Sequence, residues 1–281
     1  RMGTLNAAAY FGLHDMGAVA PGYKADLAVF DDLRTLNVKQ VYKGGKLVAE
    51  NGKMLHQKEK NTDWSTEIKE RVFHSFHRVP ITVEELQLKE TTGTHQRVID
   101  MVAHELITKE RIEEWKELPG VAPGVDISRD IVKLAAIERH KNTGHVGLGF
   151  LGKYGLKKGA VATSIGHDSH NLVIAGVTDE DMVLAGNRVI ENGGGLAIAL
   201  EGKVLADLPL PIGGLMADEP VEVVDEKLEH MKKLSVELGI SEDIDAFMTL
   251  AFISLPVIPK LRLNTYGVVD VEKHQVVEAR F

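Results

Sequence analysis

One short segment of the sequence, residues 166–171, concentrates polar side chains that could take part in chemistry. It reads Gly-His-Asp-Ser-His-Asn and precedes an apolar run that begins at Leu172. Polar groups at the edge of a buried element need partners, and a substrate or a metal ion could supply them. The alternative is a turn in which backbone amides donate hydrogen bonds to the side chains of Asp168 and Ser169. The residues alone leave both interpretations open.

Metal binding is the weaker option for the two histidines of this segment. His167 and His170 are three residues apart, so their imidazoles would share a face only if the segment were helical. Gly166 and the strand-like run that follows argue against a helix. If the segment is functional, a substrate is therefore a better expectation than a metal ion.

A second polar segment, residues 139–145, follows a predicted strand at 131–137. It reads Arg-His-Lys-Asn-Thr-Gly-His. Polar loops at strand ends are common positions for functional groups. A basic loop that contacts only water is the alternative, and for these residues taken alone it is favoured.

The hexapeptide at 147–152 matches G-x-G-x-x-G, the glycine pattern of dinucleotide-binding sites. That pattern must close a strand and open a helix. Residues 153–159 instead continue with glycines and show no helical apolar stripe. We therefore predict a structural glycine loop. A dinucleotide-dependent oxidoreductase is a rival that would require a helix beginning near Gly149.

Periodicity and turn residues predict the elements that position these segments. A short helix is expected at 4–13, and a largely buried strand at 25–30 opens a small β meander that extends to about residue 56. Thr178 is the expected cap of a helix that stops at Asn192. The remaining predicted elements are strands at 97–102, 131–137 and 172–175, a hairpin at 196–207 and an amphipathic helix at 221–238.

The composition is typical of a folded globular protein and excludes several classes of function. The 281 residues include 33 Lys plus Arg and 41 Asp plus Glu, a formal net charge of -8, which argues against a nucleic-acid partner. The absence of Cys excludes a disulfide framework, a cysteine-bound zinc ion and a thiol nucleophile. No apolar run reaches the roughly 18 residues of a membrane span, and we expect a cytoplasmic protein. Because the first residue is Arg1, we expect a chain that was cut, processed or only partly represented.

Two stretches near the start resemble the exit of an amidohydrolase-superfamily barrel into its small β domain. Residues 2–8 read Met-Gly-Thr-Leu-Asn-Ala-Ala, and residues 17–29 read Gly-Ala-Val-Ala-Pro-Gly-Tyr-Lys-Ala-Asp-Leu-Ala-Val. In that superfamily the last barrel helix is followed by a glycine-proline turn and an Ala-Asp strand. The resemblance implies that the chain contains the end of a (β/α)8 barrel.

The rest of the chain resembles the C-terminal domain of the bacterial adenine deaminase family. The His-Asp-Ser-His-Asn stretch at 167–171 and the Leu-Pro-Leu-Pro stretch at 208–211 are its most specific elements. The resulting fold class is mixed α+β: the end of a barrel, a small β-sandwich segment, and an α+β C-terminal domain. The expected parts are a barrel helix at 1–15, a small β domain at 16–60, a linker at 61–90 and the C-terminal domain at 91–281.

This resemblance implies hydrolytic deamination of adenine to hypoxanthine and ammonia. In such enzymes a divalent metal pair, manganese or iron, activates the attacking water within the barrel. The family's barrel strands carry a His-x-His pair, and no His-x-His occurs in these residues. We therefore expect the metal ligands and the metal-binding barrel, the partner of this domain, to lie outside this chain, and the chain alone not to deaminate adenine.

The resemblance also shifts the interpretation of the two polar segments towards function. We expect residues 166–171, together with Arg139 and His140, to face the barrel mouth and to help enclose adenine. The candidate catalytic residues are His167, Asp168 and His170, and the candidate substrate-binding residues are Arg139, His140, Ser169 and Asn171.

Two further alternatives remain open at this stage. The domain could be purely structural and mediate assembly, in which case residues 167–170 would lie far from any barrel metal. The enzyme could also be an amidohydrolase that acts on another substrate, such as a cyclic amide, because the barrel-exit motif alone permits it. In each case we expect a homo-oligomer.

Overall fold

The computed structural model describes residues 1–55, 64–88 and 92–281. They divide into two compact units, Arg1–Trp64 and Ser65–Phe281, and each is described by itself. Within the described part of the chain, no helix combines the length and the apolar character that crossing a lipid bilayer requires.

The first unit contains a short helical segment and one antiparallel sheet. A π-helical turn, η1 (Met2–Asn6), leads into α1 (Ala7–Tyr10), which confirms a helix near the predicted position. The sheet follows chain order and confirms the predicted meander; its strands are β1 (Leu27–Phe30), β2 (Val38–Lys43), β3 (Lys46–Glu50) and β4 (Lys53–Met54). Residues 1–55 contain no second sheet that would complete a sandwich.

The prediction that the first strand is largely buried is wrong. Ala28, Val29 and Phe30 are exposed, and only Leu27 is half-buried. Apolar strand residues become buried only when a second layer covers them. The described residues of this unit supply no such layer over β1.

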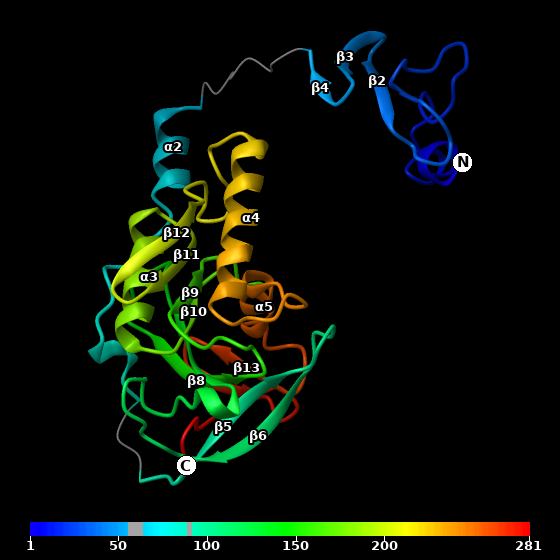
Figure 1. Cartoon of the computed structure of the whole chain (residues 1–281). Helices are drawn as coiled ribbons and strands as arrows, with labels where there is room; N and C mark the ends of the chain where they lie inside the picture. Colours follow the sequence, from blue (N-terminus) through cyan, green and yellow to red (C-terminus); the bar gives the residue numbers. More distant parts are fainter. Residues whose placement is uncertain (56–63, 89–91) are drawn as a thin grey trace. The chain divides into compact units, whose positions relative to one another are not determined.

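The second unit is built on an eight-stranded sheet with the order β12-β11-β9-β10-β7-β8-β5-β6 (Figure 1). All neighbours are antiparallel except the parallel pair β5–β8. The strands of this sheet are β5 (His95–Met101), β6 (Thr108–Glu114), β7 (Ile131–Ile137), β8 (Val146–Gly152), β9 (Ala160–Thr163), β10 (Leu172–Gly176), β11 (Gly195–Leu200) and β12 (Lys203–Pro209). The other elements are α2 (Thr66–Phe73), η2 (Glu84–Leu86), η3 (Ile127–Arg129), α3 (Asp179–Glu191), α4 (Val221–Glu237), α5 (Ala246–Ile253), β13 (Leu261–Asn264), β14 (Gly267–Asp270) and β15 (Gln275–Val277).

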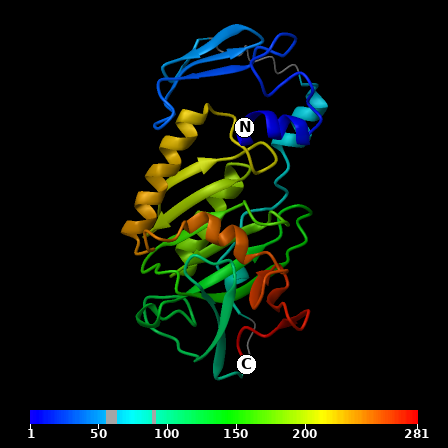
Figure 2. The same cartoon turned by 90° about the vertical axis from the view of Figure 1, so that its right-hand side faces the viewer.

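The central strands bury both of their faces because different layers cover them. On β9 and β10, Ala162 and Ile174 belong to the apolar cluster that includes Met182 of α3. Their neighbours Val161 and Val173 belong to the cluster formed with α4, α5 and β13. In Figure 1, α3 lies on one side of β9 and β10, and α4 and α5 lie on the other, which is the side that faces the viewer in Figure 2. The alternation follows from the two-residue period of a strand, and burial on both faces gives these strands their continuous apolar sequences.

Most of the predicted elements of this unit are confirmed. Strands occur at 95–101, 131–137 and 172–176, the β11–β12 hairpin turns at residues 201–202, and α4 occupies 221–237. The predicted cap of α3 is also present, since the Thr178 hydroxyl accepts a hydrogen bond from the Asp181 amide at 3.3 Å. Asn192 ends that helix, as the turn residues indicated.

The glycine hexapeptide at 147–152 is a buried strand, so the prediction of a loop is wrong. It forms most of β8, which pairs with β7 and β5. Glycine is needed there because a Cβ on Gly147 would lie 1.9 Å from the Asn264 carbonyl oxygen, and one on Gly152 would lie 2.1 Å from the Asp100 carboxylate. The dinucleotide-binding rival is excluded as well, because no helix begins near Gly149.

The segment 61–90, expected to be a linker, contains regular structure in its described part. Ser65 caps α2 by accepting a hydrogen bond from the Ile68 amide, and η2 follows at 84–86. Ile81 and Leu86 are buried in the apolar cluster beneath α3. The apolar residues of this segment are too widely spaced in the sequence to give a periodic signal.

Candidate functional site

The two polar segments singled out in the sequence meet at one end of the β7–β10 pair. These strands are antiparallel, and the last residue of β7, Ile137, lies opposite the first residue of β10, Leu172. The residues that follow β7 therefore lie beside those that precede β10. Strand pairing alone brings residues 138–145 next to residues 166–171.

Hydrogen bonds join the two segments through the backbone carbonyls of the turn at 166–170. Arg139 Nε donates to the His170 carbonyl at 2.5 Å, and His140 Nε2 donates to the Ser169 carbonyl at 2.7 Å. The His170 amide closes the turn by donating to the Gly166 carbonyl at 2.6 Å. Arg139 and His140 thus fix the path of the turn.

The alternative turn held by the side chains of Asp168 and Ser169 is wrong. Among the described residues, neither side chain takes part in a hydrogen bond, and the Asp168 side chain is 92% exposed. The turn instead leaves Asp168 and His167 accessible, the latter with 38% of its side chain exposed. These groups are free to contact another surface or a ligand.

Arg139 is a buried cation, so a loop that contacts only water is the wrong interpretation for it. Its exposed fraction is 2%. Burial lowers the pKa of the Arg139 guanidinium to about 10, although the charge of Glu138 opposes this. Nη2 donates to the Gly213 carbonyl at 3.1 Å, and the guanidinium carbon lies 4.9 Å from the centroid of the Phe76 ring. Through these contacts Arg139 holds the turn at 166–170 in place.

Three buried polar atoms around this turn have no hydrogen-bond partner among the described residues. They are Arg139 Nη1, His170 Nδ1 and Asn171 Oδ1. Burial, followed by the nearby charge of Arg139, lowers the pKa of the His170 imidazole, which favours its neutral form. The cluster therefore offers a cationic donor, a neutral imidazole and an amide oxygen, which together suit a ligand with both acceptors and donors.

Glu138 was not identified in the sequence, although it organises the 138–143 loop. Its carboxylate accepts backbone hydrogen bonds from His140 at 2.6 Å, Lys141 at 2.9 Å and Thr143 at 2.9 Å. Burial would raise the pKa of Glu138, but these amides outweigh burial and lower it to about 2. The available signal was a carboxylate directly after a buried strand and before a Thr-Gly turn, a pattern typical of loop anchoring.

The other side of the 166–171 turn rests on α5. The His167 ring stacks on Phe252 with a centroid distance of 4.5 Å, and the His167 amide donates to the Ala251 carbonyl at 2.8 Å. Phe252 in turn lines a cavity of about 350 Å³ that also borders Met248 and the buried Arg262. The turn is therefore fixed between the 138–143 loop and a helix.

The residues described by the structure do not provide a metal centre. Across 1–55, 64–88 and 92–281, no group of three or more His, Asp or Glu side chains is placed to bind a metal ion. The ring centroids of His167 and His170 are 6.4 Å apart. The divalent pair that the family resemblance implies does not fit this donor set.

Comparison with known sequences identifies the family. A profile of the adenine deaminase C-terminal domain matches residues 105–275, which include both polar segments. The chain belongs to the adenine deaminase family. The amidohydrolase family matches residues 1–48, as the resemblance of the first residues predicted.

Relatives named adenine deaminase align with nearly all of this chain. "Adenine deaminase 2" of Carboxydothermus hydrogenoformans is 45% identical over 99% of the chain, and the adenine deaminase of Petrotoga mobilis is 42% identical over 98%. The adenine deaminase of Lysinibacillus sphaericus is 40% identical over 99% of the chain. In each case the alignment covers 47% of the relative, so this member of the adenine deaminase family spans about half the length of the curated relatives it matches.

Proposed function

We propose that this chain is the C-terminal part of an enzyme that hydrolyses adenine to hypoxanthine and ammonia. In that reaction a water oxygen forms a bond to the purine carbon that carries the amino group, and the bond between that carbon and the amino nitrogen breaks. One proton of the water goes to the leaving amino group, which departs as ammonia, and the other goes to the adjacent ring nitrogen of hypoxanthine. The proposal rests on the family match over residues 105–275 and on the names of the aligned relatives.

The role proposed for this chain is to enclose the substrate. The turn at 167–171, with Arg139 and His140, presents exposed and unpartnered polar groups beside one another. We assign His167, Asp168 and His170 as candidate groups for proton movement, and Ser169 and Asn171 as groups that contact the base. Arg139 acts as a positioning residue because its donors hold the turn.

The metal chemistry of the family is assigned to residues outside this chain. We propose that the pair is manganese or iron and that the barrel, which the N-terminal match only begins to cover, provides the ligands. The described residues contain no suitable donor cluster, so the residues of this chain do not hold the metal. The chain alone is expected to show no adenine deamination.

We propose the domain boundaries expected from the sequence. Residues 1–15 are the end of the barrel, residues 16–60 form the small β domain, residues 61–90 link it to the C-terminal domain, and residues 91–281 form that domain. We further propose a cytoplasmic homo-oligomer. Sedimentation or light scattering of the full-length enzyme would test the oligomeric state.

Substitutions in the full-length enzyme test the enclosing role. His170→Ala and Asp168→Ala should lower kcat/KM for adenine by about tenfold or more, the value expected for losing one polar contact to a bound substrate. Lys141→Ala, an exposed neighbour on the adjoining loop, is the matched control and should leave kcat/KM unchanged. Unchanged values for both test variants would favour a structural or assembly role for the domain.

Product analysis separates the remaining alternative. An enzyme that acts on a cyclic amide would open a ring and release no ammonia from adenine. Formation of hypoxanthine with stoichiometric ammonia by the full-length enzyme is the expected result.

A further inference from the structure

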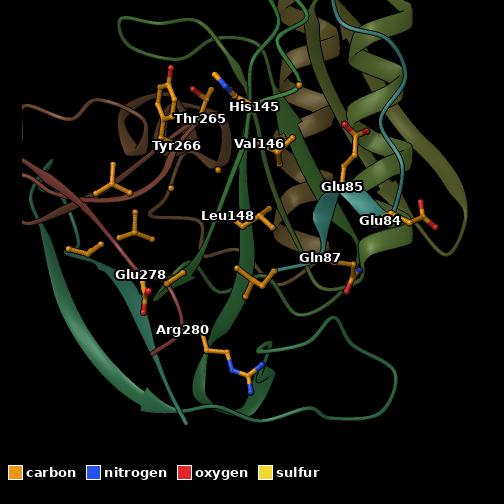
Figure 3. A pocket seen from close by; sticks show the side chains of 18 residues that line it. Glu84, Glu85, Gln87, His145, Val146, Leu148, Thr265, Tyr266, Glu278 and Arg280 are labelled. Carbon is orange, nitrogen blue, oxygen red and sulfur yellow. The ribbon is translucent and has the colours of Figure 1, made fainter. Parts of the chain in front are cut away.

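A cavity of about 350 Å³ in the second unit has a buried cation, Arg262, in its wall. The loop between β5 and β6, the helix α5 and the strand β13 border this Arg262 cavity. Its volume lies within the range of roughly 300–1,000 Å³ that small-molecule sites occupy. The larger groove in Figure 3, about 740 Å³, differs because its carboxylates Glu84 and Glu278 lie at separate edges. The guanidinium of that groove, on Arg280, already donates to the Gly93 carbonyl at 2.8 Å.

Arg262 faces away from the apolar core because of its position on β13. Its neighbours Leu261 and Leu263 are both buried in the core cluster formed with α4 and α5. Since the side chains of a strand alternate between its two faces, Arg262 projects to the opposite side. There its Nη2 donates to the carbonyl of Leu106, which also borders the cavity. The guanidinium therefore lies beside the cavity.

The exposed fractions of the lining residues place Arg262 at the inner wall and apolar side chains at the mouth. Arg262 is 1% exposed, whereas Met248 is 46% and Leu106 is 51% exposed. Met248 and Phe252 both border the cavity, and because they are four residues apart on α5 they share one face of that helix. A small molecule that fills a cavity of this size therefore contacts both α5 and Arg262.

The Arg262 guanidinium has no counter-charge among the described residues. Nη1 donates to the Leu261 carbonyl at 3.1 Å and Nη2 to the Leu106 carbonyl, while Nε has no hydrogen-bond partner in the described part of the chain. Burial lowers the pKa of Arg262 to about 10. The buried Lys133, by contrast, pairs with Asp179 at 2.6 Å. A buried charge without a partner is unfavourable, so an anion in the cavity would stabilise this one.

The other charged or titratable side chains of the lining favour a ligand with a single negative charge. They are His104, Glu105, Lys153, Asp243 and Asp245. Asp245 is engaged at the start of α5, where its Oδ1 accepts hydrogen bonds from the Phe247 and Met248 amides at 3.1 and 3.0 Å. Three carboxylates repel a multiply charged phosphate more strongly than a singly charged group. The planar fork of a guanidinium also matches the two oxygens of a carboxylate.

We propose that the Arg262 cavity binds a small molecule with one carboxylate and an apolar body. The carboxylate accepts hydrogen bonds from the Arg262 guanidinium, and the apolar body lies along Met248 and Phe252. The deamination proposed above does not require this site, and the site does not require deamination.

Two probes of equal length that differ in charge test the proposal. Hexanoate and hexanamide would be titrated separately into the full 281-residue chain and followed by calorimetry and NMR. Hexanoate should bind saturably with a Kd of about 1 mM or lower, and hexanamide at least about tenfold more weakly, because a hydrogen bond between charged groups is the stronger one. Equal affinity for the two probes, or no saturable binding of hexanoate, would overturn the proposal.

Methyl NMR locates the bound probe on the chain. Met248 and Met101 border the cavity, whereas Met182 belongs to the apolar cluster beneath α3. Saturating hexanoate should shift the methyl signals of Met248 and Met101 and leave that of Met182 unchanged. Shifts confined to methionines that do not border the cavity would contradict the assignment.

Substitutions at Met248 separate the effect of charge from that of size. Met248→Glu places a like charge at the mouth and should weaken hexanoate binding by about fivefold or more. Met248→Gln, which is similar in size but neutral, should stay within about twofold of the parent. Met216→Glu is the matched control, because Met216 is 59% exposed and does not border the cavity. An equal loss in that control would assign binding to net charge alone.

Arg262→Gln removes the charge to which the carboxylate is proposed to bind. The affinity for hexanoate should fall to that for hexanamide. The guanidinium also donates to two backbone carbonyls, so circular dichroism and thermal unfolding must accompany this variant. A folded Arg262→Gln that still prefers hexanoate by about tenfold would show that Arg262 is not the anion site. If this variant does not fold, the Met248 variants decide the question.

Discussion

Arg139 Nε donates a hydrogen bond at 2.5 Å to the backbone carbonyl of His170, across the end of two antiparallel strands. The donor is a buried cation and the acceptor belongs to a turn whose neighbouring side chains are exposed. The contact therefore links the interior of the second unit to its candidate site. Its removal should affect both the stability of the unit and the shape of the turn.

Arg139→Ala should destabilise the second unit by about 2–4 kcal/mol, because it leaves the carbonyls of His170 and Gly213 without their donor. Arg139→Lys should recover only part of this loss, since an ammonium cannot reproduce the planar arrangement of the two donors. Urea unfolding gives the free energies. Lys141→Ala is the control and should stay within about 0.5 kcal/mol of the parent; an equal loss in that variant would contradict the assignment.

Glu138→Gln should weaken the protein at neutral pH but not at low pH. The folded-state pKa of Glu138, about 2, lies below its ordinary value of 4.5, so its ionised form stabilises the fold above pH 4.5. That contribution is lost as the pH falls from about 4.5 to 2. We expect a difference of about 2 kcal/mol from the parent at pH 7, typical of hydrogen bonds to a charged group. The difference should shrink below pH 4.5 when unfolding is measured across this range, whereas Glu226→Gln should show no such trend.

The buried pair of Lys133 and Asp179 should be costly to break. Lys133 Nζ lies 2.6 Å from Asp179 Oδ1, and their side chains are 1% and 6% exposed. Burial lowers the pKa of Lys133, and the carboxylate opposes that shift. Asp179→Asn should cost about 3–5 kcal/mol, because it leaves a buried cation without its counter-charge.

A double-mutant cycle measures this coupling directly. Lys133→Met in the Asp179→Asn background should cost less than the same change in the parent. The exposed pair Lys232–Glu229, 3.0 Å apart, provides the comparison and should couple by about 0.5 kcal/mol. Similar coupling energies in the two pairs would show that burial does not strengthen the Lys133–Asp179 interaction.

Gly147→Ala should destabilise the second unit, although replacing glycine by alanine generally stabilises a folded protein because it restricts the unfolded chain. The new Cβ would lie 1.9 Å from the Asn264 carbonyl oxygen and 2.7 Å from the Gly267 amide nitrogen, so β8 and the β13–β14 turn must separate. We expect a loss of about 2 kcal/mol or more by thermal unfolding. Gly3→Ala, whose Cβ would meet nothing within 4 Å, is the control. A neutral Gly147→Ala would show that the turn can move freely.

Local chemistry was sufficient to predict many of the elements. Thr178 caps α3 through an amide three residues away, and the hairpin around Glu201 and Gly202 turns within a few residues. The buried strand β10 likewise shows in the sequence itself, as a short continuous apolar run at 172–175. These signals depend on residues that are close together in the sequence, so they can be recognised without knowledge of the fold.

The organisation of the candidate site was predictable only in part. The polar segments at 139–145 and 166–171 were identified from their composition and from the family resemblance. Their contacts were not predictable, because the donor on Arg139 and the acceptor on His170 are 31 positions apart. The same holds for Asn187, which pairs with Ile81 across 106 positions.

The sequence by itself determined the cap of α3, the turn of the β11–β12 hairpin and the family, since these depend on residue types at short spacings. The tertiary structure decided that the glycines at 147–152 form a strand, that Arg139 is buried, and that Glu138 anchors a loop. Each of these outcomes depends on a surface that another part of the chain supplies. A glycine becomes necessary only where the Asn264 carbonyl approaches it, and a cation becomes buried only where distant carbonyls satisfy its donors.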